Sequence, residues 1–411
     1  MTTDAGAAGA QSVTQSAAGP LSGLLVVDLS RALAGPHAAM MLGDLGARVI
    51  KVEATGTGDD TRGWGPPFVG PVDDPQATYF LSCNRNKESI ALDLKSADGR
   101  GVLEALVARA DVLVENFRTG VMDRLGFSSS RLHELNDRLI VLSITGFGHD
   151  GPEGGRAGYD QIMQGEAGLM SLTGSGPDDP QRVGVPIGDL LAGMYGAYGV
   201  LAALHRRAST GRGETVRTSL LASIIGVHAF QGTRVTVADE VPRAQGNHHP
   251  SIAPYGLFSC ADGAVQIAVG SEGLWRRLCD AFDLDAHAPD YATNAQRVAH
   301  REEIIGLVEE AFAPYTMDEL LARLGEAGIP AGRLRNLDDV YTWDQVASQG
   351  LLIDVQHPTL GSITLPGPPL RFFDTADGDE VETTTRRHVS PPLLDQHGTA
   401  VRDWLRETES P

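Results

Sequence analysis

The chain has 411 residues, of which 42% are hydrophobic and 21% charged, which is typical of a globular protein with two or three domains. Its 53 acidic residues outnumber its 33 basic residues, and the resulting net charge of −20 disfavours binding to nucleic acid or to an anionic membrane. Three dispersed cysteines argue against a disulfide framework or a metal site, and no apolar run is long enough for a transmembrane helix, so we expect a cytoplasmic protein.

The first segment of the chain, 1–20, consists mainly of small and polar residues. It lacks the basic and apolar regions of a signal peptide, and we expect it to be a disordered tail.

Strand-like and helical segments alternate after this tail. A short apolar run typical of a buried strand occurs at Leu24–Leu29, and further strand-like segments occur at Arg48–Glu53, Ser89–Leu94, Asp111–Glu115, Leu139–Ile144 and Thr215–Ser219. Helical patterns occur at 36–45, Ala97–Ala108, Ser129–Leu135, Leu190–His205 and 220–236. This alternation predicts an α/β domain with a parallel sheet over about 21–224.

A second, smaller domain is expected over 225–335. Two short strands, Gly256–Ser259 and Ala264–Val269, flank a turn at Asp262-Gly263 and predict a hairpin. The stretch 272–328 is strongly helical. The sequence pattern of the last segment, 336–411, predicts loops, short strands and a last helix near 398–406. We expect this segment to return to the large domain.

The first candidate functional residue is Asp189, which stands at the start of the long apolar helix beside Gly188. Its carboxylate could cap the helix by accepting hydrogen bonds from free N–H groups. It could also be a reactive carboxylate at the positive helix end, where a neighbouring glycine lets a ligand approach the backbone. Both interpretations are compatible with one structure.

Two further groups of polar residues follow predicted strands. Tyr159 and Asp160 come after a glycine-rich loop and could line a pocket, or Asp160 could simply begin a helix. The run Asn116-Phe117-Arg118 and the later Arg124 could bind phosphates beyond the carboxyl end of a strand, or the arginines could be ordinary surface residues.

Common catalytic motifs are missing from the sequence. The first strand–helix turn, 30–36, lacks the glycine pattern of dinucleotide-binding proteins, so an NAD enzyme is disfavoured although Glu53 stands near the expected ribose-binding position. The adjacent His248 and His249 are a poor pair of metal ligands, and the loop around them could instead be a mobile loop near an active site.

At these same segments the chain resembles the class III coenzyme A transferases, the CaiB/BaiF family that includes formyl-CoA transferase. The resemblance runs from about Leu21 to about 375. It is carried by the blocks VVDLSRALAGPHAAMMLGDLGARVIKVE, NRNKESIALDLK, ADVLVENFRTGVMDRLGF, GYDQIMQGEAGLMSLTG, GVPIGDLLAGMYGAYGVLAAL and TGRGETV. These blocks are specific to the family when taken together.

The resemblance implies a Rossmann-like large domain, a smaller α+β domain, and a homodimer of two interlocked rings. It implies transfer of CoA from an acyl-CoA to a free carboxylic acid, with no permanently bound cofactor and with Asp189 as the catalytic residue. The implied CoA contacts are Leu33, Ala34, Leu92, Lys95, Asn116, Phe117, Arg118 and Arg124. The implied substrate contacts are Tyr159, Asp160, Gly246, Asn247 and His248.

In this family the catalytic aspartate passes through a mixed anhydride and an aspartyl-CoA thioester. The α-methylacyl-CoA racemases share the fold and are the alternative, but their catalytic histidine is replaced here by Tyr159, although His149 lies nearby in sequence. A CoA-binding protein without activity is a third possibility, which the presence of Asp189 disfavours. Leu33 stands where formyl-CoA transferase has a glutamine and indicates a less polar acyl pocket, suited to a larger dicarboxylate or an aliphatic acid.

Overall fold

The computed structural model describes residues 19–376, 378–384 and 387–407, so the expected tail at 1–20 lies almost entirely outside the described residues. The chain divides into two compact units. The first comprises residues up to Ala167, Gly184–Ala229 and Gln345 onward, and the second comprises Gly168–Val183 and Phe230–Asp344. We expected the smaller domain over 225–335. The second compact unit covers Phe230–Asp344 and also includes Gly168–Val183.

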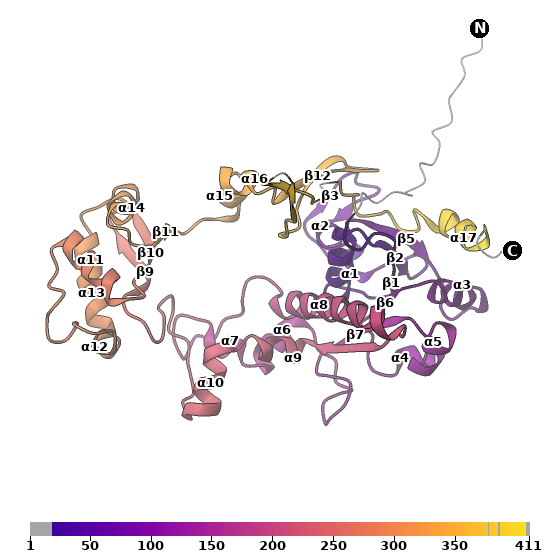
Figure 1. Cartoon of the computed structure of the whole chain (residues 1–411), viewed down its shortest axis with the longest axis horizontal. Coiled ribbons are helices and arrows are strands. Elements are labelled where there is room, and N and C mark those ends of the chain that lie inside the picture. The colour runs from indigo at the N-terminus through magenta and orange to yellow at the C-terminus, as the bar shows by residue number, and fades with distance from the viewer. Residues whose placement is uncertain (1–18, 377, 385–386, 408–411) are drawn as a thin grey trace, which may run out of the picture. The chain divides into compact units, whose positions relative to one another are not determined.

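A six-stranded parallel sheet forms the centre of the first unit (Figure 1). Its order is β5-β2-β1-β6-β7-β8, which confirms the predicted α/β architecture. The strands are β1 (Leu25–Asp28), β2 (Arg48–Glu53), β5 (Lys87–Ala91), β6 (Val112–Glu115), β7 (Ile140–Thr145) and β8 (Thr215–Ser219). The residues of the first five strands are almost all buried, as expected of a parallel sheet covered on both faces, whereas those of the edge strand β8 are mostly half-buried.

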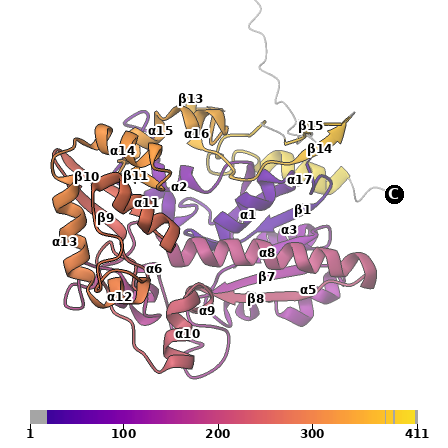
Figure 2. The ribbon, with the colours of Figure 1, turned by 60° about the vertical axis from the view of Figure 1, so that its left-hand side comes forward.

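Helices cover both faces of this sheet. Along the first unit they are α1 (Ala34–Asp44), α2 (Thr78–Ser82), α3 (Ala97–Val107), α4 (Val121–Arg124), α5 (Ser129–Leu135), α6 (Asp160–Glu166), α8 (Ile187–Thr210), α9 (Leu220–Gly226) and α17 (Gly398–Glu407). Side chains of α3, α5 and α17 share one hydrophobic core with the strands. The long helix α8 lies beside α1 and along β7 and β8 (Figure 2).

The long helix is longer than predicted at both ends. It begins after Pro186 and ends where Gly211 adopts a φ of +73°, a left-handed conformation that favours glycine. Small residues let it pack closely, since a Cβ added to Gly193 would lie 2.7 Å from the carbonyl oxygen of Ala34 on α1. By length and composition α8 is also apolar enough to span a bilayer, and in this structure one of its faces packs against α1, β7 and β8.

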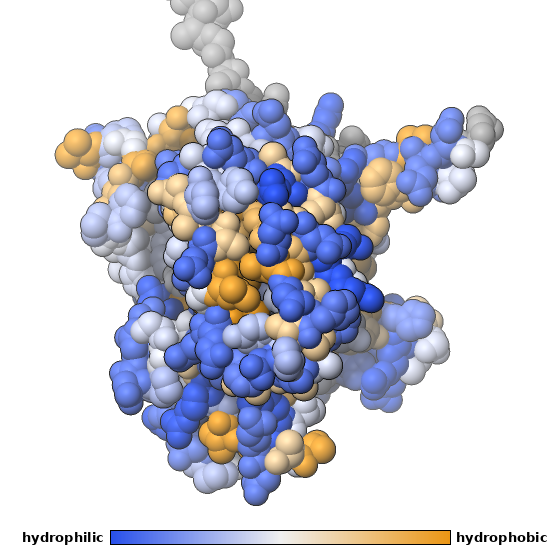
Figure 3. Space-filling view, turned by 90° about the vertical axis from the view of Figure 1, so that its left-hand side faces the viewer, coloured by the Kyte–Doolittle hydropathy of each residue, from blue (hydrophilic) through white to orange (hydrophobic). Residues whose placement is uncertain are grey.

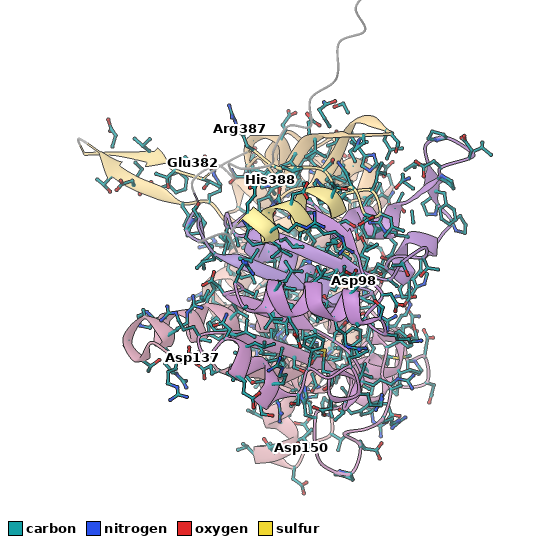
Figure 4. The ribbon with its side chains drawn as sticks, turned by 90° about the vertical axis from the view of Figure 1, so that its right-hand side faces the viewer. Asp98, Asp137, Asp150, Glu382, Arg387 and His388 are labelled. Carbon is teal, nitrogen blue, oxygen red and sulfur yellow. The ribbon has the colours of Figure 1, made fainter. Side chains whose placement is uncertain are left out.

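The irregular excursion between β2 and β5 contains little regular structure. It holds the 3₁₀ helix η1 (Asp60–Gly63), the two-residue strands β3 (Phe68–Val69) and β4 (Gln76–Ala77), and α2. The chain returns to the first unit with α16 (Asp344–Ser348), β12 (Leu352–His357), β13 (Gly361–Pro366), β14 (Phe373–Ala376), β15 (Asp379–Glu382) and α17. Figure 4 shows α17 against the first unit, where it contacts α3 and β5.

The second unit is built around a three-stranded antiparallel sheet in the order β11-β10-β9. Its elements are α7 (Leu169–Leu172), α10 (Ala229–Ala238), β9 (Tyr255–Cys260), β10 (Gly263–Ala268), α11 (Glu272–Phe282), α12 (Asn294–Ala299), α13 (Arg301–Phe312), α14 (Met317–Glu326), β11 (Ala331–Arg333) and α15 (Leu337–Tyr341). The predicted hairpin is confirmed as β9–β10, and Phe258, Trp275 and Phe312 fill the core behind it. Blue, hydrophilic residues dominate the face shown in Figure 3, in keeping with the acidic composition.

Candidate active site

Asp189 lies in the first turn of α8 and does not cap that helix. The helix begins at Ile187, three residues earlier than predicted, which places the aspartate inside the helix instead of before it. Among the described residues, none donates a hydrogen bond to its carboxylate. Asp189 is half-buried at the positive end of a 24-residue helix. Because no donor from the described part of the chain occupies its carboxylate oxygens, their lone pairs are available for reaction.

Asp160 supplies the capping contact that was considered for Asp189. Its Oδ1 accepts a hydrogen bond from the N–H of Gly188 at 2.7 Å, and its Oδ2 accepts one from Gln164 Nε2 at 2.7 Å. Asp160 is the first residue of α6, and its side chain reaches α8 instead of capping its own helix. The two carboxylates that the sequence singled out thus meet at the start of α8.

This proximity changes the acidity of Asp189. Burial raises the pKa of its carboxyl group, and the nearby charge of Asp160 raises it further, to about 7. Gly188 fits between the two acids because a Cβ at this position would lie only 3.1 Å from Asp160 Oδ1. Asp189 is therefore a carboxylate of raised basicity beside a helix end, a combination that is frequent at catalytic sites.

One wall beside Asp189 is apolar. Its neighbour Leu190 packs against a small cluster formed by Leu33, Met40, Cys83 and Tyr79. Leu33, which follows β1, therefore lies near the start of α8. Its implied place in an acyl pocket stays a prediction.

Tyr79 is a residue that the sequence analysis missed. Burial, then the charge of Asp189, raises the pKa of its phenol to about 12, so the hydroxyl stays protonated and can donate a hydrogen bond near the reactive carboxylate. The ring of Trp64 meets that of Tyr79 edge to face, with centroids 5.1 Å apart. Both residues lie in the irregular excursion, where no periodic pattern distinguishes them.

Asn116 joins two of the segments that the resemblance assigned to CoA. Its Oδ1 accepts a hydrogen bond from the N–H of Arg31 at 2.8 Å, and its Nδ2 donates one to the carbonyl oxygen of Arg31 at 2.7 Å. The guanidinium of Arg31 lies 5.4 Å from the centre of the Phe117 ring. The turn before α1 and the loop after β6 therefore form one surface at the carboxyl edge of the sheet, where ligands of open parallel sheets bind.

The other implied CoA residues differ in what they can offer a ligand. Arg118, Arg124 and Lys95 are exposed after the carboxyl ends of β6 and β5, and their charges are accessible. Leu92 and Ala34 are only 3% and 2% exposed, so any contact with CoA would use their backbone. The implied role of each residue stays a prediction.

His149 lies in a different environment from Asp189. Its Nε2 is 2.7 Å from Ser143 Oγ, and that hydroxyl also contacts the buried Glu115. Burial lowers the pKa of His149 and raises that of Glu115. These residues line a cavity of about 120 Å³ together with Arg217.

Gly246, Asn247 and His248 belong to the second unit. They line a cavity of about 630 Å³ that also includes Gln266. The loop is closely packed, because a Cβ at Gly256 would lie 2.4 Å from the carbonyl oxygen of Asn247. Its implied contact with substrate stays a prediction. Tyr159, in the first unit, is 64% exposed.

A parallel sheet with a surface of loops at its carboxyl edge, together with a carboxylate of raised pKa at the start of a long helix, is typical of an enzyme of α/β architecture. The model of CoA-transferase family III matches residues 21–398. The chain belongs to this family and is a class III CoA-transferase.

Curated relatives carry specific activities in their names. Human succinyl-CoA:glutarate CoA-transferase is 38% identical over 384 residues, covering 93% of this chain and 85% of that protein. The succinate–glutarate CoA-transferase of Agrobacterium fabrum is 40% identical over 341 residues, covering 82% and 85%. Acetyl-CoA:oxalate CoA-transferase of Acetobacter aceti is 36% identical and covers 95% of this chain and 97% of that protein.

A solved structure shares the fold. The crystal structure of a CaiB/BaiF family protein from Brucella suis is 40% identical, with a TM-score of 0.81, and covers 94% of this chain and 99% of that chain.

Proposed function

We propose that this CoA-transferase moves CoA from an acyl-CoA donor to a free dicarboxylic acid through covalent intermediates on Asp189. The observation that carries the proposal is the position of this carboxylate, at the positive end of α8 with a pKa raised to about 7 and without a hydrogen-bond donor among the described residues. A more basic carboxylate is a better nucleophile, and the ionised fraction at neutral pH is still large.

The reaction proceeds in four balanced steps. A carboxylate oxygen of Asp189 attacks the thioester carbonyl of the donor, the C–S bond breaks, and CoA leaves as a thiolate. The thiolate then attacks the aspartyl carbonyl of the mixed anhydride, which releases the donor acid and forms the aspartyl-CoA thioester. The acceptor carboxylate attacks this thioester and expels the thiolate again. The thiolate finally attacks the acceptor's acyl carbonyl, which yields the new acyl-CoA and regenerates the Asp189 carboxylate.

The surroundings of Asp189 support this chemistry. Each tetrahedral intermediate carries an oxyanion, and a hydroxyl that stays protonated, such as that of Tyr79, can donate a hydrogen bond to it. The apolar cluster around Leu33 and Leu190 limits the access of water, to which anhydrides and thioesters are sensitive.

The names of the relatives support a dicarboxylic acid as acceptor. They include glutarate, oxalate, mesaconate and D-citramalate, and succinyl-CoA is the donor in several of them. The apolar Leu33 at the implied acyl position is consistent with an acid larger than oxalate. We therefore propose succinyl-CoA as donor and glutarate as the first acceptor to examine.

We also propose that the enzyme is a homodimer. Four apolar residues of α8 remain exposed at a spacing of three to four residues, and a helix face of this kind is typical of an interface. They are Met194, Tyr195, Tyr198 and Leu201, which are 50%, 39%, 71% and 37% exposed. The interlocked arrangement of the two chains is the form that the resemblance implies.

The test replaces the nucleophile. Asp189→Asn keeps the shape of the side chain, and we expect CoA transfer from succinyl-CoA to glutarate to fall by more than about a thousandfold while CoA still binds. The matched control is Asp137→Asn, an exposed aspartate labelled in Figure 4, which should keep full activity.

Trapping identifies the attacked atom. Hydroxylamine added during turnover should convert Asp189 to its hydroxamate, visible by peptide mass mapping in the wild-type enzyme and missing in Asp189→Asn. Modification at another residue, or retained turnover of the variant, would contradict the proposal. Exchange of deuterium at C2 of an acyl-CoA without transfer would instead support the racemase alternative.

A further inference from the structure

Two of the chain's three lysines, Lys51 and Lys87, are completely buried in the first unit. The remaining lysine is the exposed Lys95, and all other residues among the 33 Lys and Arg are arginines. A lysine ammonium is a compact charge with three donors, whereas the guanidinium of arginine is larger and planar. In a chain that otherwise uses arginine, two buried lysines indicate positions where the shape of arginine does not fit.

The two lysines pair with two buried aspartates, and we name this set of four residues, Asp28, Lys51, Asp59 and Lys87, the buried charge frame. Lys87 Nζ lies 2.9 Å from Asp28 Oδ2, and Lys51 Nζ lies 2.9 Å from Asp59 Oδ2 and 3.9 Å from Asp28 Oδ2. All four side chains are completely enclosed. Burial opposes the charge of Lys51, but the surrounding carboxylates outweigh burial and raise its pKa.

Each member of the frame also holds the backbone of one turn, 30–36, which connects β1 to α1. The contacts are Lys51 Nζ to the carbonyl oxygen of Ser30 at 2.8 Å, Lys87 Nζ to the carbonyl oxygen of Pro36 at 2.8 Å, the N–H of Ser30 to Asp28 Oδ1 at 3.0 Å and the N–H of Ala32 to Asp59 Oδ1 at 3.3 Å. The frame therefore fixes both ends and the middle of the turn.

The turn has a conformation that it would not keep unaided. Ala32 has a φ of +64°, a left-handed conformation that is unfavourable for a residue other than glycine. The next residue, Leu33, packs against Leu190 beside the reactive aspartate. The position of Leu33 at the acyl pocket thus depends on a strained turn, and the frame supplies the contacts that hold it.

We propose that the buried charge frame is a positioning device for the acyl-CoA site, and that Lys51 and Lys87 are positioning residues of the transfer reaction. By fixing the turn at 30–36 against the start of α8, the frame sets the affinity for acyl-CoA and the choice of acyl group. This inference rests on the proposed function, in which the turn contacts CoA and the acyl group.

A second buried ion pair provides a matched control. Arg85 and Asp44 lie 2.6 Å apart and are only 6% and 5% exposed. Arg85 also donates to the carbonyl oxygen of Pro366, and none of its hydrogen bonds among the described residues reaches the turn. We expect Arg85→Met, which breaks this pair, to lower stability about as much as Lys87→Met does, while all contacts between the buried charge frame and the turn stay in place.

The experiment compares Lys87→Met and Lys87→Arg with Arg85→Met in the full-length enzyme. Melting temperature, CoA dissociation constant, and KM and kcat for succinyl-CoA and acetyl-CoA are measured well below each variant's melting temperature. We expect both Lys87 variants to raise KM for succinyl-CoA about tenfold or more and to change the succinyl-to-acetyl preference at least threefold. Arg85→Met should lower the melting temperature similarly, with KM and preference within twofold of wild type.

Lys87→Arg keeps the positive charge at this position and changes the shape of the side chain, so it separates the effect of shape from that of charge. If it restores the wild-type KM and acyl preference, or if the Lys87 variants change only the melting temperature, the inference is wrong. Asp59→Asn is a milder variant for the case that Lys87→Met fails to fold, and it should change KM in the same direction. A failure of the proposed function is detected by a different variant. Retained turnover of Asp189→Asn would contradict the proposed function even if the variants of the buried charge frame behave as expected.

Discussion

At the scale of single residues, the acidity of Asp189 is the property on which the proposed mechanism depends. An ordinary aspartate is a weak base, and burial beside Asp160 raises the pKa of this one to about 7. In the proposed mechanism the ionised form is the nucleophile, so transfer should require deprotonation near neutral pH. The N–H of Gly188 donates a hydrogen bond to Asp160 and so holds this carboxylate close to Asp189, the residue that follows Gly188. The same contact therefore contributes to the raised pKa of Asp189.

The first prediction concerns the pH dependence of this reactivity. We expect kcat to rise with pH through about 7 in the wild-type enzyme, because Asp189 loses its proton there. Asp160→Asn removes one of the two causes of the raised pKa and should move this rise to lower pH. The pH–rate profile of transfer checks the prediction, and a profile unchanged by the substitution would contradict the assigned coupling.

The second prediction concerns stability. Since the pKa of Asp189 is higher in the folded than in the unfolded protein, the wild type loses stability as pH rises from about 4 to about 7 and no further above 7. Asp189→Asn should therefore be more stable than wild type by about 2 kcal/mol at pH 8, with a smaller gain at pH 5. Denaturant unfolding at the two pH values measures this, and a variant less stable than wild type at pH 8 would count against it.

The third prediction uses the scarcity of lysine. Lys95 is exposed whereas Lys51 and Lys87 are buried, so an amine-acetylating reagent should modify Lys95 alone among the lysines of the folded protein. If Lys95 contacts CoA, saturating CoA should slow its acetylation several-fold. Peptide mass mapping reports the rates, and the unfolded protein, in which all three lysines react, is the control. Equal rates with and without CoA would exclude the contact.

At the scale of elements, the packing of α1 against α8 joins the CoA surface to the catalytic helix. Gly193 permits the close approach, because an added Cβ would meet the Ala34 carbonyl oxygen at 2.7 Å and the His37 ring at 3.1 Å. A backbone carbonyl cannot yield as a flexible side chain can. Any side chain here must therefore push the two helices apart.

The fourth prediction follows from this contact. Gly193→Ala should destabilise the protein by about 1–3 kcal/mol and lower transfer activity, since α1 carries the turn of the acyl pocket. Gly101→Ala is the matched control, because it is a helical glycine on α3 with open space around it and should stabilise by about 0.5–1 kcal/mol. Thermal unfolding compares the two, and the same sign for both variants would contradict the packing argument.

At the scale of the whole molecule, the apolar face of α8 is the feature that a single chain leaves incomplete. The helix buries small residues against α1 and β7 but exposes Tyr198 and its apolar neighbours. Burying such a face against a second copy removes it from water, which is favourable in proportion to the apolar area. Both the homodimer and the cytoplasmic location remain predictions.

The fifth prediction tests this surface. Tyr198→Glu places a charge in the middle of the exposed face and should convert the dimer to monomers or to aggregates of non-native size. Val72→Glu, at a position that is 99% exposed, should leave the mass unchanged. Light scattering coupled to size-exclusion chromatography gives the masses. A wild-type monomer, or a Tyr198→Glu variant that remains a dimer, would contradict the assignment.

The sequence by itself determined the alternating architecture and singled out Asp189 as the predicted reactive residue. Strands such as Arg48–Glu53 and Val112–Glu115 are short segments rich in β-branched and other apolar residues, and the helix that follows Pro186 has small residues in a helical pattern, so local sequence patterns are sufficient to predict them. Asp189 could be singled out as a candidate because its segment is distinctive along the chain. The start of its helix could not, because Ile187 and Gly188 carry no local N-terminal signal.

Only the tertiary structure decided how these parts act on one another. The contact between Asp160 and Gly188, the protonated phenol of Tyr79 and the enclosure of Lys51 and Lys87 all join residues distant in sequence. Their energetics depend on burial and on the distance between charges, both of which are set by packing and neither of which leaves a periodic trace in the sequence. The sequence therefore predicts which residue is the nucleophile, and the fold gives that residue its acidity and its surroundings.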